Sequence, residues 1–182
     1  MPRQARMTSA TCVYHTILRG VNKQQVFEDE EDYLRFLNVL RRQTQLYVDD
    51  QGRTLPPRCY IYAYCLMGNH IHLLVKEGSE TIGEIMKRIA SSYVYHYNHK
   101  YDRVGHLFQE RFKSQPVNDF TYFITLLRYI HQNPLKASLV ESIDDYVWSS
   151  WQEYNGKAHE GFCSTQVVLD RMSFVELKHL VD

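Results

Sequence analysis

The chain has 182 residues, of which 44% are hydrophobic and 23% are charged, a composition typical of a globular protein with one sizeable core. Lys plus Arg and Asp plus Glu number 21 each, so net charge alone predicts no particular partner. No apolar run approaches about 18 residues and no signal-peptide pattern occurs, which argues against membrane spanning and secretion. The four cysteines show no C-x-x-C pairing, which predicts a reduced, cytoplasmic protein with free thiols.

The N-terminal third predicts a basic arm, a strand and a helix. Residues 1–12 form the expected arm, and alternating apolar residues over 13–19 predict a strand. Helical spacing of apolar residues over 29–47, behind an acidic first turn, predicts a helix. Proline and glycine in 49–57 then predict a loop.

Two strands follow, joined by a tight turn. Residues 58–66 are rich in tyrosine and alternate, which places Tyr60, Tyr62 and Tyr64 on one face of the predicted strand. Gly68-Asn69 suits a two-residue hairpin turn, so this strand should pair antiparallel with the next one. The fold around them should leave one face of the sheet free for function.

The second of these strands contains a His-x-His pattern. Side chains alternate along a strand, so His70 and His72 should point the same way while Ile71 points into the core. Their Cα atoms would be about 6.5–7 Å apart, close enough for two imidazoles to bind one ion.

The rest of the chain completes the pattern of elements. A capping box at Thr81 and Glu84 predicts a helix over 81–101, and a strand is expected over 111–117. A helix over 119–133 should end before Pro134 because proline restricts the preceding residue. The order β-α-β-β-α-β-α predicts an α+β fold, with a ferredoxin-like βαββαβ antiparallel sheet, helices on one face and an added helix that carries function. A short helix from about residue 173 is expected in the tail, 151–182.

The helix over 119–133 brings two polar residues together. Tyr129 and Asn133 are four residues apart and therefore neighbours on one helix face. From spacing alone, an exposed surface is the commoner explanation of such a pair. Clustered cations make Arg19, Lys23, Lys87, Arg88, Arg111 and Lys113 candidates for binding a polyanion such as a nucleic-acid backbone, although surface helices also carry such charges.

Four sequence blocks resemble the single-tyrosine HUH transposases, the IS200-like transposases, and among them the REP-associated tyrosine transposases. The blocks are YHTILRG at 14–20, MGNHIHLL at 67–74, GHLFQERFK at 105–113 and RYIHQNPLKA at 128–137. They follow in order within the region expected to form the catalytic domain, 13–150. The tail matches less well.

The resemblance implies a function and a role for each matched residue. His70 and His72 would bind Mg²⁺ or Mn²⁺, with Asn133 as a further ligand, and Tyr129 would be the nucleophile. The implied reaction cleaves and rejoins single-stranded or hairpin-flanked DNA through a 5′-phosphotyrosine intermediate. The implied partner is DNA and not a membrane. The resemblance does not decide between a monomer and a homodimer. Two alternatives remain: a metal-dependent phosphodiesterase that uses water, and a non-catalytic protein that binds DNA hairpins.

Overall fold

The centre of the molecule is a four-stranded antiparallel sheet in the order β4-β5-β1-β6. The computed structural model describes residues 7–158 and 160–181. The strands of this sheet are β1 (Val13–Arg19), β4 (Cys59–Met67), β5 (His70–Glu77) and β6 (Lys113–Val117), and β2 (Tyr47–Val48) pairs with β3 (Thr54–Leu55) in a separate hairpin. The central strand order confirms the predicted ferredoxin-like arrangement.

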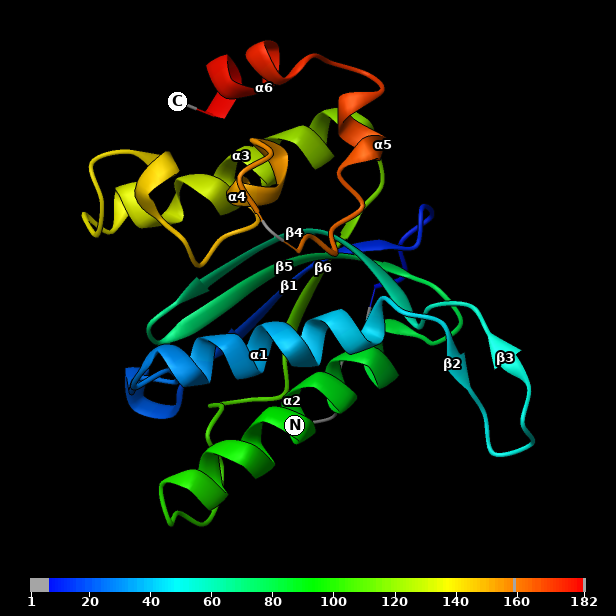
Figure 1. Cartoon of the computed structure of the whole chain (residues 1–182), viewed down its shortest axis with the longest axis vertical. Helices are drawn as coiled ribbons and strands as arrows, with labels where there is room; N and C mark the ends of the chain where they lie inside the picture. Colours follow the sequence, from blue (N-terminus) through cyan, green and yellow to red (C-terminus); the bar gives the residue numbers. More distant parts are fainter. Residues whose placement is uncertain (1–6, 159, 182) are drawn as a thin grey trace.

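Helices cover both faces of the sheet. The helices are α1 (Glu30–Gln43), α2 (Ile82–Lys100), α3 (Phe120–Lys136), α4 (Trp151–Tyr154), α5 (Gln166–Leu169) and α6 (Phe174–Val181), with short 3-10 turns η1 (Val21–Lys23) and η2 (Ile143–Asp145). Figure 1 shows α1 and α2 on one face, and α3 with the C-terminal helices on the other. The β2–β3 hairpin projects from the body of the molecule (Figure 1).

The core between the sheet and the first two helices follows from alternation in the strands and helical spacing in the helices. Tyr14 and Leu18 of β1 face this core, where they pack with Phe36 of α1 and with Ile85 and other apolar residues of α2. Both helices begin where the sequence predicts. The Asp29 carboxylate accepts a hydrogen bond from the Asp32 N–H, and Thr81 and Glu84 form the predicted capping box.

The opposite face is more covered than the sequence suggested. Leu127 and Ile130 of α3 pack on it, together with the fully buried Trp151 and residues of α5 and α6. The expectation of one free sheet face is therefore wrong. The tail contributes apolar side chains to this core, and their spacing in the sequence follows neither a helical nor a strand period. A cavity lined by Ile17, Arg19, His70 and His72 lies on this face, beside the start of β5.

A β-bulge in β4 changes the predicted distribution of its tyrosines. The pairing with β5 shifts between Ile61 and Ala63, and one extra residue reverses which face the following side chains meet. Tyr64 therefore packs with Ile61 in the core under α1 and α2, whereas Tyr62 packs on the α3 side. The prediction that Tyr60, Tyr62 and Tyr64 share a face is wrong for this reason.

The prediction that the 119–133 helix ends before Pro134 is also wrong, since α3 continues through Pro134 to Lys136. Proline lacks the N–H that would bond the carbonyl of Ile130, four residues earlier. The Asn133 side chain replaces it: Nδ2 donates to the Ile130 carbonyl at 3.3 Å and to the Tyr129 carbonyl at 2.8 Å. A local side-chain hydrogen bond thus offsets the cost of proline inside the helix.

Several element boundaries also differ. The helix expected over 29–47 ends at Gln43, since the Thr44 hydroxyl bonds the Arg41 carbonyl and the chain turns into the β2–β3 hairpin. The strand expected over 111–117 begins at Lys113, so Arg111 precedes it. Of the expected basic arm 1–12, residues 1–6 lie outside the described residues. Ser9 is buried, and its hydroxyl bonds the Val117 carbonyl at 3.2 Å.

The C-terminal segment also closes the outer edge of β4. The N–H of Leu66 donates to the Trp148 carbonyl at 2.9 Å, and the N–H of Ser150 donates to the Tyr64 carbonyl at 3.0 Å. Farther along the strand, the N–H of Ser164 donates to the Ile61 carbonyl at 2.8 Å. The tail thereby occupies hydrogen-bonding positions that an edge strand otherwise exposes.

Candidate catalytic site

The two histidines of β5 lie near the start of that strand. The hairpin turn at Gly68-Asn69 pairs Met67 with His70, which places His70 at the first position of the strand. His72 follows on the same face, and the two ring centroids are 5.0 Å apart. His70 is half-buried and His72 is 2% exposed. The alternation of the strand and the turn together position the pair.

Each of these rings uses its Nδ1 atom in a hydrogen bond. His70 Nδ1 lies 2.6 Å from Asn69 Oδ1, and His72 Nδ1 lies 3.1 Å from His15 Nε2. No residue in the described part of the chain hydrogen-bonds the Nε2 atom of either ring. Both histidines therefore keep Nε2, the other donor atom of the imidazole, for a ligand.

Burial keeps these imidazoles neutral at neutral pH. Burial and, to a smaller extent, the neighbouring His15, His70 and Arg19 together lower the pKa of His72 to about 3. Burial also lowers the pKa of His15 to about 4 and, together with Arg19, the pKa of His70. A neutral imidazole has a lone pair available, which is the state that binds a metal ion.

Tyr129 of α3 lies beside the histidines of the same chain. Its ring centroid is 5.4 Å from that of His72 and 6.0 Å from that of His15, and both contacts are edge-on. The side chain is 38% exposed, so its hydroxyl-bearing ring borders solvent while it packs on the imidazoles. The helix docks here because Leu127 and Ile130 pack against the sheet on either side of Tyr129 in the sequence.

Asn133 lies one turn farther along α3 and is 9% exposed. Its Nδ2 bonds two helix carbonyls, as described above. That leaves Oδ1, an oxygen donor, without a hydrogen bond to any residue that the structure describes.

A cavity of about 270 Å³ has Tyr129, His70 and His72 in its wall, whereas Asn133 is not among its lining residues. Its other lining residues are Ile17, Arg19, Gln109, Glu110, Arg111 and Lys113. Three of the predicted DNA-binding cations, Arg19, Arg111 and Lys113, are thus brought to the site. Sequence reasoning missed Gln109 and Glu110, although they belong to the GHLFQERFK block.

The remaining predicted cations lie elsewhere. Arg88 forms an ion pair with Glu80 at 2.7 Å, and Glu80 also holds Arg58 at 3.0 Å. Lys23 belongs to η1, and Lys87 lines a second cavity. One further cation, missed from the sequence, lies at the site: Lys136 Nζ is 5.2 Å from the Tyr129 ring centroid. Its position seven residues after Tyr129, about two helical turns, was the available signal.

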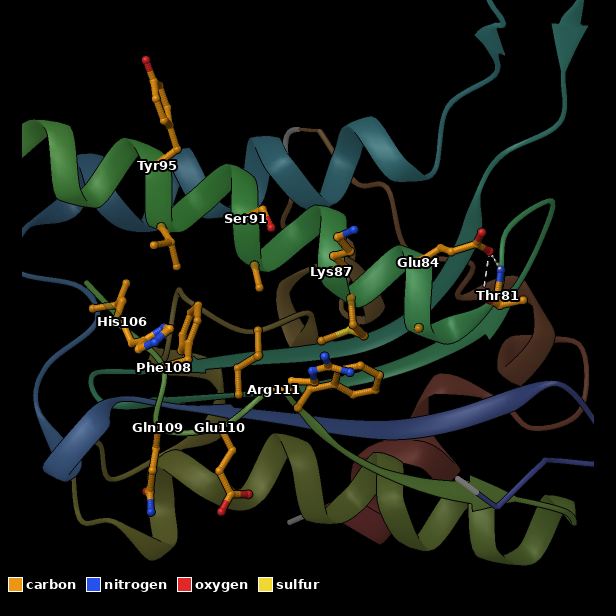
Figure 2. Close-up of a pocket in the computed structure, with 17 residues that line it drawn as sticks. Thr81, Glu84, Lys87, Ser91, Tyr95, His106, Phe108, Gln109, Glu110 and Arg111 are labelled. Atoms are coloured by element: carbon orange, nitrogen blue, oxygen red, sulfur yellow. Dashed lines mark hydrogen bonds between the residues drawn. The ribbon is translucent and has the colours of Figure 1, made fainter. Parts of the chain in front are cut away.

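The second cavity is a groove of about 1070 Å³ between α2 and the segment 106–112. Figure 2 shows Phe108 below α2, and Gln109 and Glu110 pointing away from that helix. Gln109, Glu110 and Arg111 line both cavities. Residues 109–111 are therefore a shared wall between the groove and the Tyr129 site.

Two features are absent from the described residues, 7–158 and 160–181. No helix there is long and apolar enough to cross a membrane. No group of three or more His, Cys, Asp and Glu side chains in residues 7–158 and 160–181 is arranged to hold a metal ion.

Comparison with known proteins identifies the family. The model of the family described as "Transposase IS200 like" matches residues 8–133, a span that contains the histidine pair, Tyr129 and Asn133. The fold is similar to a solved structure titled "Structure of the REP associates tyrosine transposase bound to a REP hairpin". The TM-score is 0.64 at 16% identity, over 89% of this chain and 90% of that chain. No curated protein matches the chain. The chain belongs to the family of IS200-like transposases.

Proposed function

We propose that the protein is a metal-dependent DNA strand transferase of the HUH type that cleaves and rejoins single-stranded, hairpin-flanked DNA. The observation that carries the proposal is the placement of Tyr129 within one chain, 5.4 Å ring to ring from His72. Both a nucleophile and two neutral nitrogen donors face one cavity. A nucleophile beside a pair of metal-binding donors is one arrangement that can cleave a phosphodiester through a covalent intermediate.

The donor set fits a divalent cation. The Nε2 atoms of His70 and His72 are uncharged donors at the cavity. The Oδ1 atom of Asn133, which lies outside the cavity lining, is the proposed third donor. Uncharged donors leave the full charge of the cation in place. Nitrogen and oxygen donors together suit Mn²⁺ and are compatible with Mg²⁺. A bound cation would supply positive charge that polarises the scissile phosphate and offsets charge in the transition state.

Tyr129 provides the nucleophile in the proposed reaction. Its Oη attacks phosphorus, the bond from phosphorus to the 3′-oxygen breaks, and the phenol proton is lost. The departing 3′-oxygen gains a proton and becomes a hydroxyl, while the 5′-phosphate stays on the tyrosine. Since the phosphotyrosine bond conserves the energy of the phosphodiester, a second 3′-hydroxyl can displace Tyr129 and rejoin DNA.

Cations around the cavity support binding of the DNA backbone. Arg19, Arg111 and Lys113 line the same cavity as Tyr129, where their charges can neutralise phosphates. We propose that the strand continues into the groove, which Lys87 lines and where its charge can neutralise a phosphate. Arg88 is less suited because Glu80 already holds it. The REP hairpin bound to the structurally similar transposase makes a DNA hairpin the appropriate first substrate.

The test is covalent capture of labelled DNA. The protein is incubated with a 5′- or 3′-labelled hairpin with single-stranded flanks and Mg²⁺ or Mn²⁺, and denaturing gels are run. We expect a protein–DNA adduct in the wild type that is lost in Tyr129→Phe. Tyr122→Phe, on the same helix but outside the cavity lining, is the matched control and should keep the adduct.

The same gel separates the alternatives. Cleavage that survives Tyr129→Phe without an adduct would indicate a phosphodiesterase that uses water. Hairpin binding without cleavage in Mg²⁺ or Mn²⁺, unaffected by His70→Ala, would indicate a non-catalytic binding protein. Either result would overturn the proposal.

A further inference from the structure

His15 is a buried polar residue for which the proposed reaction has no role. It is the third residue of β1 and is 5% exposed. Its strand neighbours are Leu74 on β5 and Gln115 on β6, and His72 lies opposite Ile17, two positions farther along β1. His15 and His72 are therefore diagonal neighbours on one sheet face, a relation in which long side chains touch.

The contact between the two imidazoles is specific. The rings stack with centroids 5.3 Å apart and an interplanar angle of 14°. His15 Nε2 lies 3.1 Å from His72 Nδ1. A hydrogen bond between two neutral imidazoles needs one nitrogen with a proton and one without. The position of this proton, on His15 Nε2 or on His72 Nδ1, therefore determines the tautomer of both rings.

We infer that His15 is a positioning residue whose Nε2 accepts a hydrogen bond from the Nδ1–H of His72, so that the lone pair of His72 Nε2 faces the cavity. This inference rests on the proposed function, because the lone pair matters for the proposed cation. The opposite polarity would place a proton on His72 Nε2 and block it as a donor. His70 has a matching arrangement, since its Nδ1 faces the acceptor Asn69 Oδ1 at 2.6 Å.

The contact with His72 separates this role from that of a metal ligand, because the Nε2 atom of His15 is already used toward His72. His15 also meets the Tyr129 ring edge-on at 6.0 Å, so one buried ring supports both the nitrogen donor and the nucleophile. Groups that orient metal-binding histidines in this way typically change metal affinity 10- to 100-fold when removed.

The first experiment measures Mn²⁺ affinity in two variants, by the electron paramagnetic resonance signal of free Mn²⁺. His15→Leu fills the space without an acceptor and should raise the dissociation constant about 10- to 100-fold. His15→Gln places an amide oxygen near the position of Nε2 and should restore most of the affinity. Cys65→Ala is the control for packing, because Cys65 is the strand neighbour of His72 and is buried. It should lower thermal stability and leave Mn²⁺ affinity unchanged.

The second experiment uses the wild-type protein, so no substitution can impair folding. Long-range ¹⁵N–¹H NMR spectra of the metal-free wild type report which ring nitrogen of each histidine carries a proton. We expect His72 to be protonated on Nδ1. A His72 ring protonated on Nε2 would overturn the inference.

A third variant distinguishes failure of this inference from failure of the proposed function. His72→Ala should abolish Mn²⁺ binding if the metal site is correct. If Mn²⁺ binding is lost in His72→Ala but unchanged in His15→Leu, the positioning role is wrong and the metal site stands. If neither substitution changes Mn²⁺ affinity, the metal site is wrong, and the inference is wrong with it.

Discussion

The two polar atoms of the Asn133 side chain have different roles. Its Nδ2 replaces the N–H that Pro134 lacks, and its Oδ1 is the proposed third donor to the cation. A loss of activity in an Asn133 variant would therefore not by itself distinguish a helix that has become irregular from a missing ligand. The neighbouring proline makes the two effects separable, because Pro134→Ala would give back the missing backbone N–H.

A double-mutant cycle at Asn133 and Pro134 should show this separation. Asn133→Ala alone leaves the buried Ile130 carbonyl without its side-chain partner, and we expect a loss of about 1–3 kcal/mol of stability. In the Pro134→Ala background the same substitution should cost less, since the backbone N–H can bond that carbonyl. Mn²⁺ affinity should fall equally in both backgrounds.

The measurements for this cycle are urea unfolding of the four proteins and Mn²⁺ titration of each. Additive stability changes would contradict the helical role of Nδ2. Recovery of Mn²⁺ affinity with Pro134→Ala would show that Asn133 acts on the cation only through the shape of the helix.

At the level of single residues, the sequence supported the identity of the site but not its geometry. The His-x-His spacing placed His70 and His72 on one face, as strand alternation requires. The partnership of His15 with His72 depends on strand register between β1 and β5, two segments far apart in the sequence. Spacing on a helical wheel also did not show whether Tyr129 faced solvent or the sheet, because that depends on how α3 docks.

At the level of elements, regular patterns were predictable and exceptions were not. The Gly68-Asn69 turn and the capping box at Thr81 fixed two element boundaries by local chemistry alone. The bulge between Ile61 and Ala63 was not predictable, because one inserted residue leaves composition unchanged while it reverses the faces of β4. The docking of the tail depends on apolar and polar residues that are irregularly spaced in the sequence, so no periodic pattern predicts it.

The attachment of α6 is one such set of contacts. Lys178 of α6 donates to Asp144 Oδ2 at 2.9 Å, and Trp151 Nε1 donates to Asp144 Oδ1 at 2.7 Å. The Gln132 side chain of α3 donates to the Val181 carbonyl at 2.8 Å. Gln132 lies between Tyr129 and Asn133 in sequence, so α6 supports the helix that carries the proposed nucleophile from its outer side.

The Asp144 contacts predict a pH dependence of stability. Hydrogen bonds from Lys178 and Trp151 lower the pKa of Asp144 from 3.8 to about 2. A carboxyl whose pKa is lowered on folding stabilises the native state above its unfolded pKa, and this contribution is lost as pH falls from about 4 toward 2. After discounting for partial exposure, we expect about 1–2 kcal/mol.

Comparison of urea unfolding at pH 6 and pH 3 for the wild type and Asp144→Ala checks this. The variant should be less stable at pH 6, and the difference between the two proteins should shrink at pH 3. An equal difference at both pH values would mean that the ionised carboxylate of Asp144 contributes nothing. Asp170→Ala is a suitable control, since Asp170 has no ion pair in the described part of the chain.

At the scale of the whole molecule, the arrangement favours a protein that works as a single chain. The residues of the proposed site, from β5 and α3, meet within one chain. The tail occupies the outer edge of β4, and β6 at the other edge contains Pro116, which has no N–H to offer a further strand. Extension of the sheet into a second copy is therefore disfavoured at both edges.

Mixing two inactive variants tests this expectation. His72→Ala and Tyr129→Phe should each be inactive in adduct formation, and an equal mixture should remain inactive because neither chain contains a complete site. Light scattering should give a mass near the 21.7 kDa of one chain. Recovery of activity on mixing would show that the tyrosine of one chain serves the histidines of another.

Residues 109–111 form a wall that the cavity and the groove share. The groove side of this wall is drawn in Figure 2. Two ligands that each bind better to one conformation of this wall cannot bind independently. If a ligand in the groove changes the affinity of the cavity for its ligand by some factor, thermodynamic linkage requires that the cavity ligand change the affinity of the groove by the same factor. DNA that binds in the groove and prefers one conformation of this wall would in this way change the affinity of the cavity for the phosphate at Tyr129.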